Sequence, residues 1–466
     1  MVNDSSERIA AALRERVAAA APGALLPSTR AIAAEFGAGP VTVQRALRLL
    51  NAQGLVESRP GVGTFVRARR TARPGDYGWQ TAALGAPGAR IPGGPAALRT
   101  AGPDAIALHS GYPDRELLPE TLVKAALARA ARGDAAIGRP PATGLPELRA
   151  WFAAELGEAA PAGTAPPAAS DVVIVPGSQS GLSSAFRVLV GPGRPLLIES
   201  PTYWGAITAA AREGVATVPI PSGPDGPDPD QLAEAFARTG ARAFYAQPNF
   251  ANPTGAQWTP GLAGRVLDVV RDHGAFLIED DWAREFGIDA DAPPLAARDD
   301  AGHVVYLRSL TKSVSPAVRV AAVIARGPAR ERIIADARAE AMYVSGLLQA
   351  AALDVVTRPA WRTHRKGLRH RLASRRDLLA AGLRELAPQA HLTAMPRGGL
   401  HLWARLPDGT DLPALVRACD DAGVLVVSGD EWFPAEPTGP HLRLNYSGPD
   451  PGSFREAAAA IGRALG

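Results

Sequence analysis

Cysteine and lysine are scarce in this chain, and long apolar stretches are missing from it. The single Cys419 can form neither an internal disulfide nor a cysteine-based zinc site, and we expect no metal centre. No uninterrupted apolar window approaches the length of a membrane-spanning helix, and the N-terminus lacks the basic-then-apolar order of a signal peptide. These absences predict a cytoplasmic protein without a membrane partner.

Lysine occurs only three times, at Lys124, Lys312 and Lys366, while arginine supplies nearly all of the positive charge. A lysine amine can lose its proton when it is desolvated and then attack a carbonyl, whereas a guanidinium stays charged. Lys312 follows an apolar run at 304–308 and precedes a segment rich in serine and proline. It is therefore a candidate for Schiff-base formation, although residue type alone favours a solvated surface lysine.

The length of 466 residues exceeds what one hydrophobic core normally supports, so we expect two or more domains. The net charge of +4 is unevenly spread, because residues 1–70 contain ten arginines against five acidic residues. This basic head, residues 1–70, carries +5 and leaves about −1 for the remainder. Such a distribution fits nucleic-acid binding, although charge alone leaves open a merely solvated arginine-rich helix.

The head shows three short helical patterns followed by a hairpin. Apolar residues recur at helical spacing from Ile9 to Ala20, Ser28 can cap a second helix through Phe36, and a third helix can begin at Pro40. The second and third helices are joined by a three-residue turn, which predicts a helix-turn-helix whose last helix can lie in a major groove. The hairpin at 55–66 has a basic, glycine-rich tip and would form a wing.

Residues 5–68 resemble the winged helix of GntR-type regulators. The motifs are Leu-Pro-Ser-x-Arg at 26–30, Thr-Val at 42–43, Gly-Leu-Val at 54–56 and Arg-x-Gly-x-Gly-Thr-Phe-Val at 59–66. One departure is Gly39-Pro40, where the family usually has Ser-Arg. The resemblance implies binding to double-stranded DNA. It also implies that Arg30 and Arg59 contact DNA phosphates, and that Thr42, Gln44 and Arg45 face the bases or the DNA backbone.

Residues 71–103 are rich in glycine, proline and alanine and are expected to form a linker. From residue 104 onward, short apolar strands alternate with amphipathic helices. The expected strands are Val172–Val175, Leu196–Glu199, Ala216–Ile220, Ala243–Gln247, Phe276–Glu279, Val304–Arg308 and Val320–Ala325. This alternation predicts an α/β fold with a mainly parallel sheet covered on both faces, whose active site lies at the C-terminal ends of the strands.

Polar residues follow several of these strands. Glycine leads into Ser178 and Gln179 at a helix N-terminus, where free amides suit an anion. Tyr203 offers a flat phenol, and Asn252 an amide held in an Asn-Pro turn. Asp280 is a carboxylate at a buried strand end and needs a partner such as a protonated ring nitrogen. Taken singly, each feature also has a purely structural explanation.

Together these motifs resemble fold-type I, pyridoxal phosphate-dependent aminotransferases over residues 104–466. Asn-Pro-Thr-Gly at 252–255, Glu-Asp-Asp at 279–281 and Ser-x-Thr-Lys at 309–312 occur in the order of that family. The resemblance implies a large part at about 104–345 and a smaller α+β part at about 346–466.

The same resemblance implies roles for individual residues. Lys312 would be the catalytic amine that forms the Schiff base with pyridoxal 5'-phosphate, Asp280 would pair with the pyridine nitrogen, and Asn252 would bond the ring 3-oxygen. Tyr203 would stack on the ring, and Arg443 would bind a substrate carboxylate. The phosphate would be held by Ser178, Gln179, Ser309 and Arg319.

Two positions in residues 104–466, the body of the chain, depart from the aminotransferase pattern. Trp282 stands near the cofactor where relatives commonly have a tyrosine, and its indole can donate a hydrogen bond but can neither ionise nor accept one. Ile137-Gly138 stands where relatives often have Tyr-Gly.

A GntR-type head fused to an aminotransferase-like body resembles the MocR subgroup of transcription regulators. The resemblance implies a homodimer that binds DNA and senses pyridoxal phosphate, an amine or an amino acid through Lys312. The alternative is a working pyridoxal phosphate-dependent aminotransferase with an accessory or degenerate head.

Overall fold

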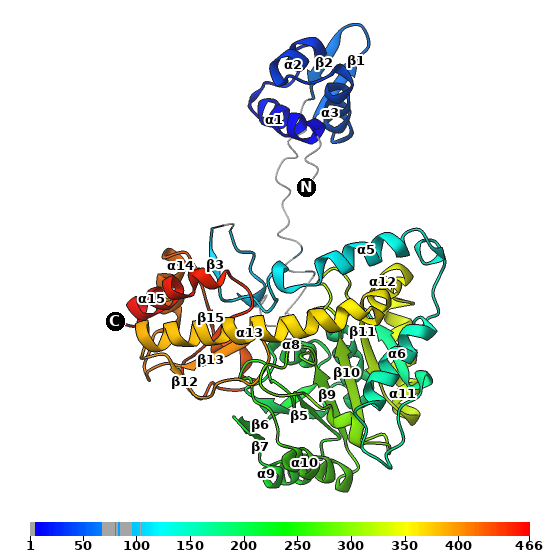
Figure 1. Cartoon of the computed structure of the whole chain (residues 1–466), viewed down its shortest axis with the longest axis vertical. Helices are drawn as coiled ribbons and strands as arrows, with labels where there is room; N and C mark the ends of the chain where they lie inside the picture. Colours follow the sequence, from blue (N-terminus) through cyan, green and yellow to red (C-terminus); the bar gives the residue numbers. More distant parts are fainter. Residues whose placement is uncertain (1–4, 68–79, 81–82, 84–95, 103) are drawn as a thin grey trace. The chain divides into compact units, whose positions relative to one another are not determined.

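The computed structural model describes residues 5–67, 80, 83, 96–102 and 104–466. The chain forms two compact units, Met1–Pro87 and Gly88–Gly466. Most of the expected linker at 71–103 lies outside the described residues. Figure 1 shows both units with the labels used below.

The head contains α1 (Ser5–Ala19), α2 (Thr29–Phe36), α3 (Pro40–Ala52), β1 (Val56–Arg59) and β2 (Gly63–Val66). Its helix boundaries follow the predicted signals: the Ser28 hydroxyl accepts from the amide of Ala31 at 3.2 Å, and Pro40 opens α3. Gly37 ends α2 with φ = 58°, a left-handed conformation that glycine adopts without a Cβ clash. The predicted helix-turn-helix and wing are therefore confirmed.

A small hydrophobic core holds the head together. The two strands of the wing pair antiparallel, with Val56 opposite Val66. The buried side chains come from all three helices and the wing; they include Ile9, Leu13, Ile32, Val43, Leu50, Val56 and Val66. The head thus has a core of its own.

The second unit is built on an eight-stranded sheet with the order β4-β11-β10-β9-β8-β5-β6-β7. The strands are β4 (Val172–Val175), β5 (Pro195–Ser200), β6 (Ala216–Gly223), β7 (Gly226–Pro227), β8 (Ala243–Ala246), β9 (Phe276–Asp281), β10 (Val304–Ser309) and β11 (Ala321–Ile324). Neighbours from β10 to β6 run parallel, whereas β11 is antiparallel to both β10 and β4 and β7 is antiparallel to β6. The predicted, mainly parallel α/β fold is confirmed.

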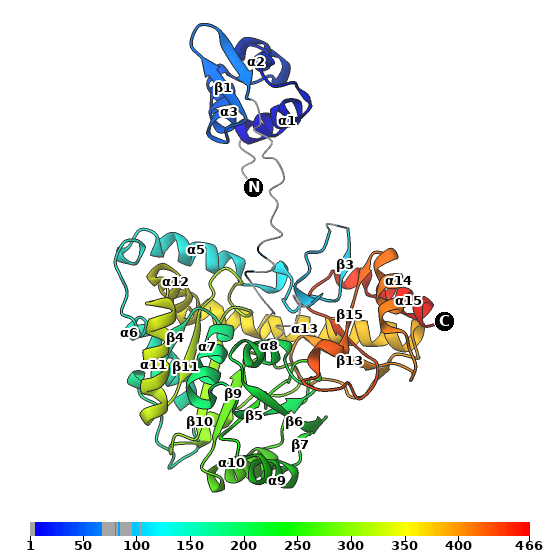
Figure 2. The same cartoon turned by 180° about the vertical axis from the view of Figure 1, so that it is seen from behind.

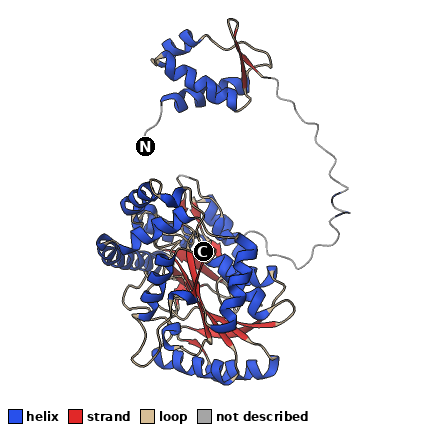
Figure 3. Cartoon of the chain, turned by 90° about the vertical axis from the view of Figure 1, so that its right-hand side faces the viewer, coloured by secondary structure: helices blue, strands red, loops and turns tan. Residues whose placement is uncertain are grey.

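Two helical layers cover this sheet (Figure 3). Val172 and Ile174 of β4 belong to the core on one face of the sheet, which also holds residues of α5 (Glu120–Ala130), α6 (Pro146–Gly157), α9 (Pro229–Thr239), α10 (Pro260–Asp272) and α12 (Gly346–Thr357). Val173 and Val175 belong instead to the core on the other face, which also holds residues of α7 (Ser178–Ala185), α8 (Trp204–Arg212) and α11 (Gly327–Ala341), the layer seen in Figure 2. Alternate residues therefore enter opposite cores, as the pleat of a strand requires.

The C-terminal part carries a four-stranded antiparallel sheet with the order β12-β13-β16-β15. Its strands are β12 (His391–Leu392), β13 (His401–Arg405), β15 (Val427–Ser428) and β16 (His441–Asn445). The long helix α13 (Pro359–Leu386) leads into this part, where α14 (Leu412–Asp421) and α15 (Phe454–Leu465) complete the core. In addition, β3 (Ile106–Ala107) pairs with β14 (Val424–Leu425), so the first strand of the body lies against the C-terminal part.

Candidate functional site

A pocket surrounds Lys312 at the C-terminal ends of the parallel strands. It is lined by all nine residues that the sequence assigns to a cofactor: Ser178, Gln179, Tyr203, Asn252, Asp280, Trp282, Ser309, Lys312 and Arg319. Tyr112, Gln247 and Thr311 complete the lining. Its free volume is about 60 Å³.

Lys312 lies three residues after the end of β10 and is only partly exposed. Its amine lies 4.2 Å from the centre of the Trp282 ring and 6.0 Å from that of Tyr112. Burial, assisted by the positive charge of Arg443, lowers the pKa of Lys312 to about 7, against the opposing effect of Asp280. The amine can therefore be an uncharged nucleophile close to neutral pH.

Asp280 is buried, and only one of its carboxylate oxygens has a partner. Oδ2 accepts hydrogen bonds from the Tyr245 hydroxyl and the Gln247 amide, both at 2.9 Å. Oδ1 is buried and has no hydrogen-bond partner among the described residues. Burial raises the pKa of Asp280 despite the opposing bonds from Gln247 and Tyr245. A cationic N–H donor from a ligand would satisfy Oδ1 and stabilise the charged carboxylate.

Asn252 is fixed on two sides, by the nearby Gln247 and by Trp432, which is distant in the sequence. Its backbone amide donates to Oε1 of Gln247 at 2.8 Å, and its side-chain Oδ1 accepts from the indole of Trp432 at 3.0 Å. Gln247 thus connects Asn252 with Asp280. Asn252 lines the pocket, and its side-chain amide nitrogen carries two N–H donors.

Groups that suit an anion gather at the N-terminus of α7. Gly177 precedes this helix with φ = 92°, and a Cβ at this position would lie 2.9 Å from the Arg319 guanidinium. Glycine is required here for the backbone conformation and for the approach of Arg319. Arg319 itself has φ = 49° and donates to the carbonyl of Pro176 at 3.3 Å. Free amides and a guanidinium together suit a phosphate.

The remaining predicted side chains lie around these groups. The Tyr203 hydroxyl donates to Oε1 of Gln179 at 3.4 Å, and Gln179 donates to the carbonyl of Gly205 at 2.7 Å. The Ser309 hydroxyl accepts from the amide of Thr311 at 3.1 Å.

Arg443 does not line the pocket itself, but its charge acts on Lys312. It is 1% exposed, donates to the carbonyl of His109, and packs 4.5 Å from the centre of the Trp432 ring. Its Nε atom has no hydrogen-bond partner in the described structure. Burial lowers the pKa of Arg443 to about 9, an effect that a bound carboxylate would oppose.

Sequence reasoning missed six residues of this site: Tyr112, Tyr245, Gln247, Thr311, His401 and Trp432. His401 is buried, its ring is 5.7 Å from that of Trp282, and its Nε2 has no described partner. Burial and the charges of Arg443 and Lys312 hold the pKa of His401 well below its usual value, so the ring is neutral. The position of Gln247 directly after β8 was the one signal available in the sequence.

In the head, the predicted DNA-facing residues divide between α2, α3 and the wing. A groove between α3 and the wing is lined by residues that include Ser28, Gln44, Arg48, Arg59 and Thr64. Arg59 is paired with Glu57 at 3.1 Å and lies 4.9 Å from the centre of the Phe65 ring. Arg30 and Arg45 are exposed, and Thr42 is half-buried. Arg48, which was not among the predicted contacts, lies in the groove with Gln44.

Two negative findings apply to the described part of the chain. It contains no cluster of three or more histidine, cysteine, aspartate or glutamate residues that could hold a metal ion. None of its helices is both long and apolar enough to span a membrane.

Comparison with known proteins relates each unit to a family. Residues 103–461 match the class I and II aminotransferases, and residues 5–66 match the gntR family of bacterial regulatory proteins. The 2-aminoadipate transaminase of Thermus thermophilus is 30% identical over 371 residues, which cover 78% of this chain and 90% of that protein.

A relative with a regulatory name matches across both units. The probable rhizopine catabolism regulatory protein MocR of Rhizobium meliloti is 28% identical over 443 residues, covering 94% of this chain and 88% of the relative. Among solved structures, the α-aminoadipate aminotransferase LysN of Thermus thermophilus, complexed with N-(5'-phosphopyridoxyl)-L-leucine, superposes with a TM-score of 0.71. The match has 28% identity and covers 78% of this chain and 92% of that structure.

Proposed function

The chain belongs to the class I and II aminotransferase family, and because it joins that domain to a gntR-type DNA-binding head, we propose that it is a ligand-sensing transcription regulator. The observation that carries this proposal is the completeness of both units in one chain. The head has its own core and wing, and the body has a largely buried lysine in a polar pocket. The MocR relative is similar over 94% of this chain, a span that includes both units.

The pocket fits pyridoxal 5'-phosphate as the cofactor. Asp280 holds an unsatisfied buried oxygen that suits a protonated ring nitrogen, and α7 offers free amides beside Arg319 for a phosphate. Lys312 has a lowered pKa that suits attack on an aldehyde. When bound, pyridoxal phosphate supplies an aldehyde that exchanges between amines and a ring that withdraws electrons from the bonds beside the nitrogen.

Each side chain then has a defined task. Lys312 supplies the amine, and Asp280 holds the proton of the ring nitrogen while Tyr245 and Gln247 keep its carboxylate oriented. Asn252 is positioned by Trp432 to donate to the 3-oxygen. Tyr203 would cover the ring, and Ser178, Gln179, Ser309 and Arg319 would hold the phosphate.

Arg443 would select amino-acid effectors by their carboxylate. Its buried guanidinium keeps an unsatisfied Nε and lacks a carboxylate ion pair in the described structure, so a ligand carboxylate would supply the missing counter-charge. Neutral His401 stands close to Arg443 and Lys312 and would contact the rest of the effector. The proposed effector is therefore an amino acid.

The regulator would act in the cytoplasm. It would act as a homodimer, because two heads are needed to read paired DNA sites. Exposed apolar side chains support an interface on the body: Ile137 is 95% exposed and Met342 is 64% exposed. A second chain would cover such residues. Binding of an effector would then change how the dimer presents its heads.

A second candidate function is catalytic transamination. It is favoured by the combined presence of Lys312, Asp280, Asn252 and Arg443, and by the similarity to a 2-aminoadipate transaminase. Trp282 favours the sensor, because an indole cannot take the place of a tyrosine hydroxyl that accepts or releases a proton.

One experiment separates the two functions. Full-length protein loaded with pyridoxal phosphate is mixed with a panel of amino acids, while the visible spectrum and the release of keto acid are followed. The regulator predicts a spectral change that saturates at one equivalent, without repeated keto-acid release, and specific protection of DNA upstream of its own gene. Repeated turnover without DNA protection would establish the enzyme instead.

A further inference from the structure

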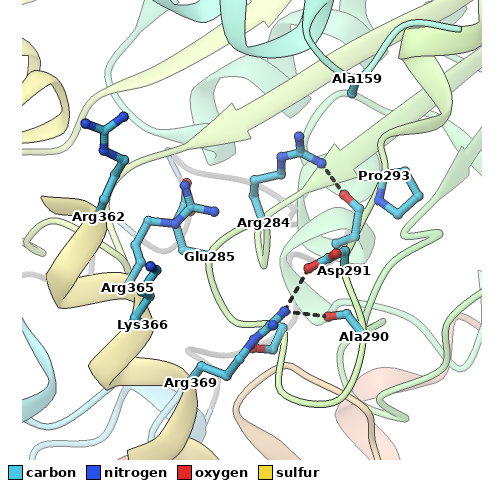
Figure 4. A pocket seen from close by; sticks show the side chains of 12 residues that line it. Ala159, Arg284, Glu285, Ala290, Asp291, Pro293, Arg362, Arg365, Lys366 and Arg369 are labelled. Carbon is cyan, nitrogen blue, oxygen red and sulfur yellow. Dashed lines mark hydrogen bonds and ion pairs between the residues drawn. The ribbon is translucent and has the colours of Figure 1, made fainter. Parts of the chain in front are cut away.

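A second pocket lies away from Lys312, between α13 and the loop at 284–293 that follows β9 (Figure 4). Its free volume is about 470 Å³, and it shares no lining residue with the pocket around Lys312. This volume is within the range of small-molecule sites, roughly 300–1,000 Å³. Neither the DNA-binding role nor the cofactor chemistry uses it.

The lining of this pocket is strongly basic. Arg362, Arg365, Lys366 and Arg369 contribute from α13, and Arg284 contributes from the opposite wall. The four helical residues are separated by three, one and three positions, which places them on one face of α13. Figure 4 shows the basic side chains of both walls around the same space.

The two acidic residues of the lining are neutralised by arginines. Glu285 forms a buried ion pair of 2.5 Å with Arg308, which lies outside the lining, and Asp291 forms an exposed ion pair of 2.8 Å with Arg369. By contrast, Arg362, Arg365 and Lys366 make no ion pair in the described part of the chain. Three neighbouring cations thus repel one another, and the carboxylate that acts on Arg365, that of Glu285, is already paired with Arg308.

Two other basic residues of the lining bind backbone carbonyls of the loop at 284–293 and so stabilise the pocket wall. Arg284 donates to the carbonyl of Ala292, and Arg369 donates to the carbonyls of Gly287 and Ala290 at 3.2 and 3.3 Å. These bonds fix the loop opposite α13 and keep the pocket concave. If the basic face of α13 were only solvated, no ordered loop would be needed opposite it.

We propose that this pocket is a second ligand site, which binds a small molecule carrying two or more phosphate groups. Guanidinium groups hold phosphate oxygens by paired hydrogen bonds, and Lys366 adds a point charge. A multiply charged phosphate group relieves the repulsion among Arg362, Arg365 and Lys366. The concave shape and limited volume favour a small molecule over the extended backbone of a duplex.

The first test is calorimetric titration of full-length protein, loaded with pyridoxal phosphate, with inorganic triphosphate and with inorganic monophosphate. The proposal predicts tighter binding of triphosphate than of monophosphate. Replacing Arg362, Arg365 and Lys366 together with glutamine should weaken triphosphate binding at least about tenfold, because each charged hydrogen bond contributes to affinity. Equal triphosphate affinity in the wild type and this variant would refute the proposal.

A matched control removes three charges elsewhere. Arg238, Arg265 and Arg417 are exposed and lie outside both pockets. Their joint replacement with glutamine should leave triphosphate binding unchanged, and an equal loss would show that only net charge matters. If the α13 variant binds triphosphate normally but loses affinity for duplex DNA, the pocket belongs to a DNA path and the proposal fails.

A second measurement needs no substitution. Lysine acetylation can be followed at single residues in this chain, because it has only three lysines. Triphosphate should slow the acetylation of Lys366 several-fold and leave that of Lys124 unchanged, since Lys124 lies outside the pocket. Equal acetylation of Lys366 with and without triphosphate would contradict the proposal even if the triple variant failed to fold.

Discussion

The amine of Lys312 lies 4.2 Å from the centre of the Trp282 indole ring. An aromatic face attracts a cation, so this contact favours the protonated lysine, whereas burial favours the neutral amine. Burial prevails, because the pKa of Lys312 is lowered to about 7. Trp282 therefore moderates the reactivity of the lysine in addition to occupying the place of a tyrosine.

The first prediction concerns the pH dependence of pyridoxal phosphate uptake. The protonated amine is unreactive, so the rate of covalent uptake should rise through pH 7 and level off above it, far below the ordinary lysine pKa of 10.5. Stopped-flow absorbance from acidic to strongly basic pH measures this rate. A rate that keeps climbing up to the ordinary lysine pKa would show that Lys312 is not desolvated in solution.

Trp282→Leu should lower the pH at which the rate of pyridoxal phosphate uptake reaches half of its maximum. A desolvated cation–π contact is worth about 2 kcal/mol, and about 1.4 kcal/mol corresponds to one pKa unit, so the shift should be roughly one and a half units. Trp282→Phe keeps an aromatic face and should give a smaller shift. An unchanged or raised midpoint in the leucine variant would mean that the indole does not stabilise the ammonium.

Asp280→Asn should weaken pyridoxal phosphate binding about 10–100-fold, because a hydrogen bond to a charged group contributes about 1.5–3 kcal/mol. The amide can still accept from Tyr245 and Gln247, but it cannot hold the proton of the ring nitrogen. Equilibrium dialysis measures the loss. Asp281→Asn is the control, since Asp281 accepts from Tyr306 at 2.6 Å and does not line the pocket. Equal losses in both variants would remove the specific role of Asp280.

Trp432→Phe should lower stability by about 1–3 kcal/mol and loosen cofactor binding, because Oδ1 of Asn252 would be left buried without a donor. The phenyl ring can still pack under Arg443. Urea unfolding and spectral titration give the two quantities. Trp403→Phe is the nearby control, with its ring 6.4 Å from Trp432 and no bond to Asn252. A cofactor affinity equal to that of the wild type would show that Asn252 needs no such support.

In the head, Arg48→Ala should weaken DNA binding to all sequences alike. It should also reduce the steepness of the plot of log K against log[salt] by about one. Arg48 lines the groove between α3 and the wing, whereas Arg8 on α1 does not. Fluorescence anisotropy at several salt concentrations measures both effects, with Arg8→Ala as the control. An unchanged salt slope would place the phosphate contacts elsewhere on the head.

The sequence predicted those parts of the molecule that are encoded locally. The Ser28 cap, the Pro40 helix start and the apolar strands follow from neighbouring residues, and the parallel topology then brings their polar ends together. Family resemblance placed Lys312 and Asp280 in one pocket.

The supporting contacts could not be predicted, because they join residues far apart in the chain. Trp432 lies 180 positions from Asn252, and Gln247 lies 33 positions from Asp280. The basic face of α13 can be recognised from the helical spacing of its residues in the sequence. The opposite wall of the pocket, at 284–293, is brought next to α13 only by the fold. Geometry at such separations depends on the packing of the whole body.

The most direct test of the account is the affinity of the full-length protein for DNA upstream of its gene, measured with and without pyridoxal phosphate and an amino acid. Wild-type affinity should change on ligand addition, whereas Lys312→Ala should bind the same DNA with an affinity that ligand does not alter. A Lys312→Ala protein that still takes up pyridoxal phosphate covalently, or wild-type DNA affinity that no ligand changes, would contradict the account.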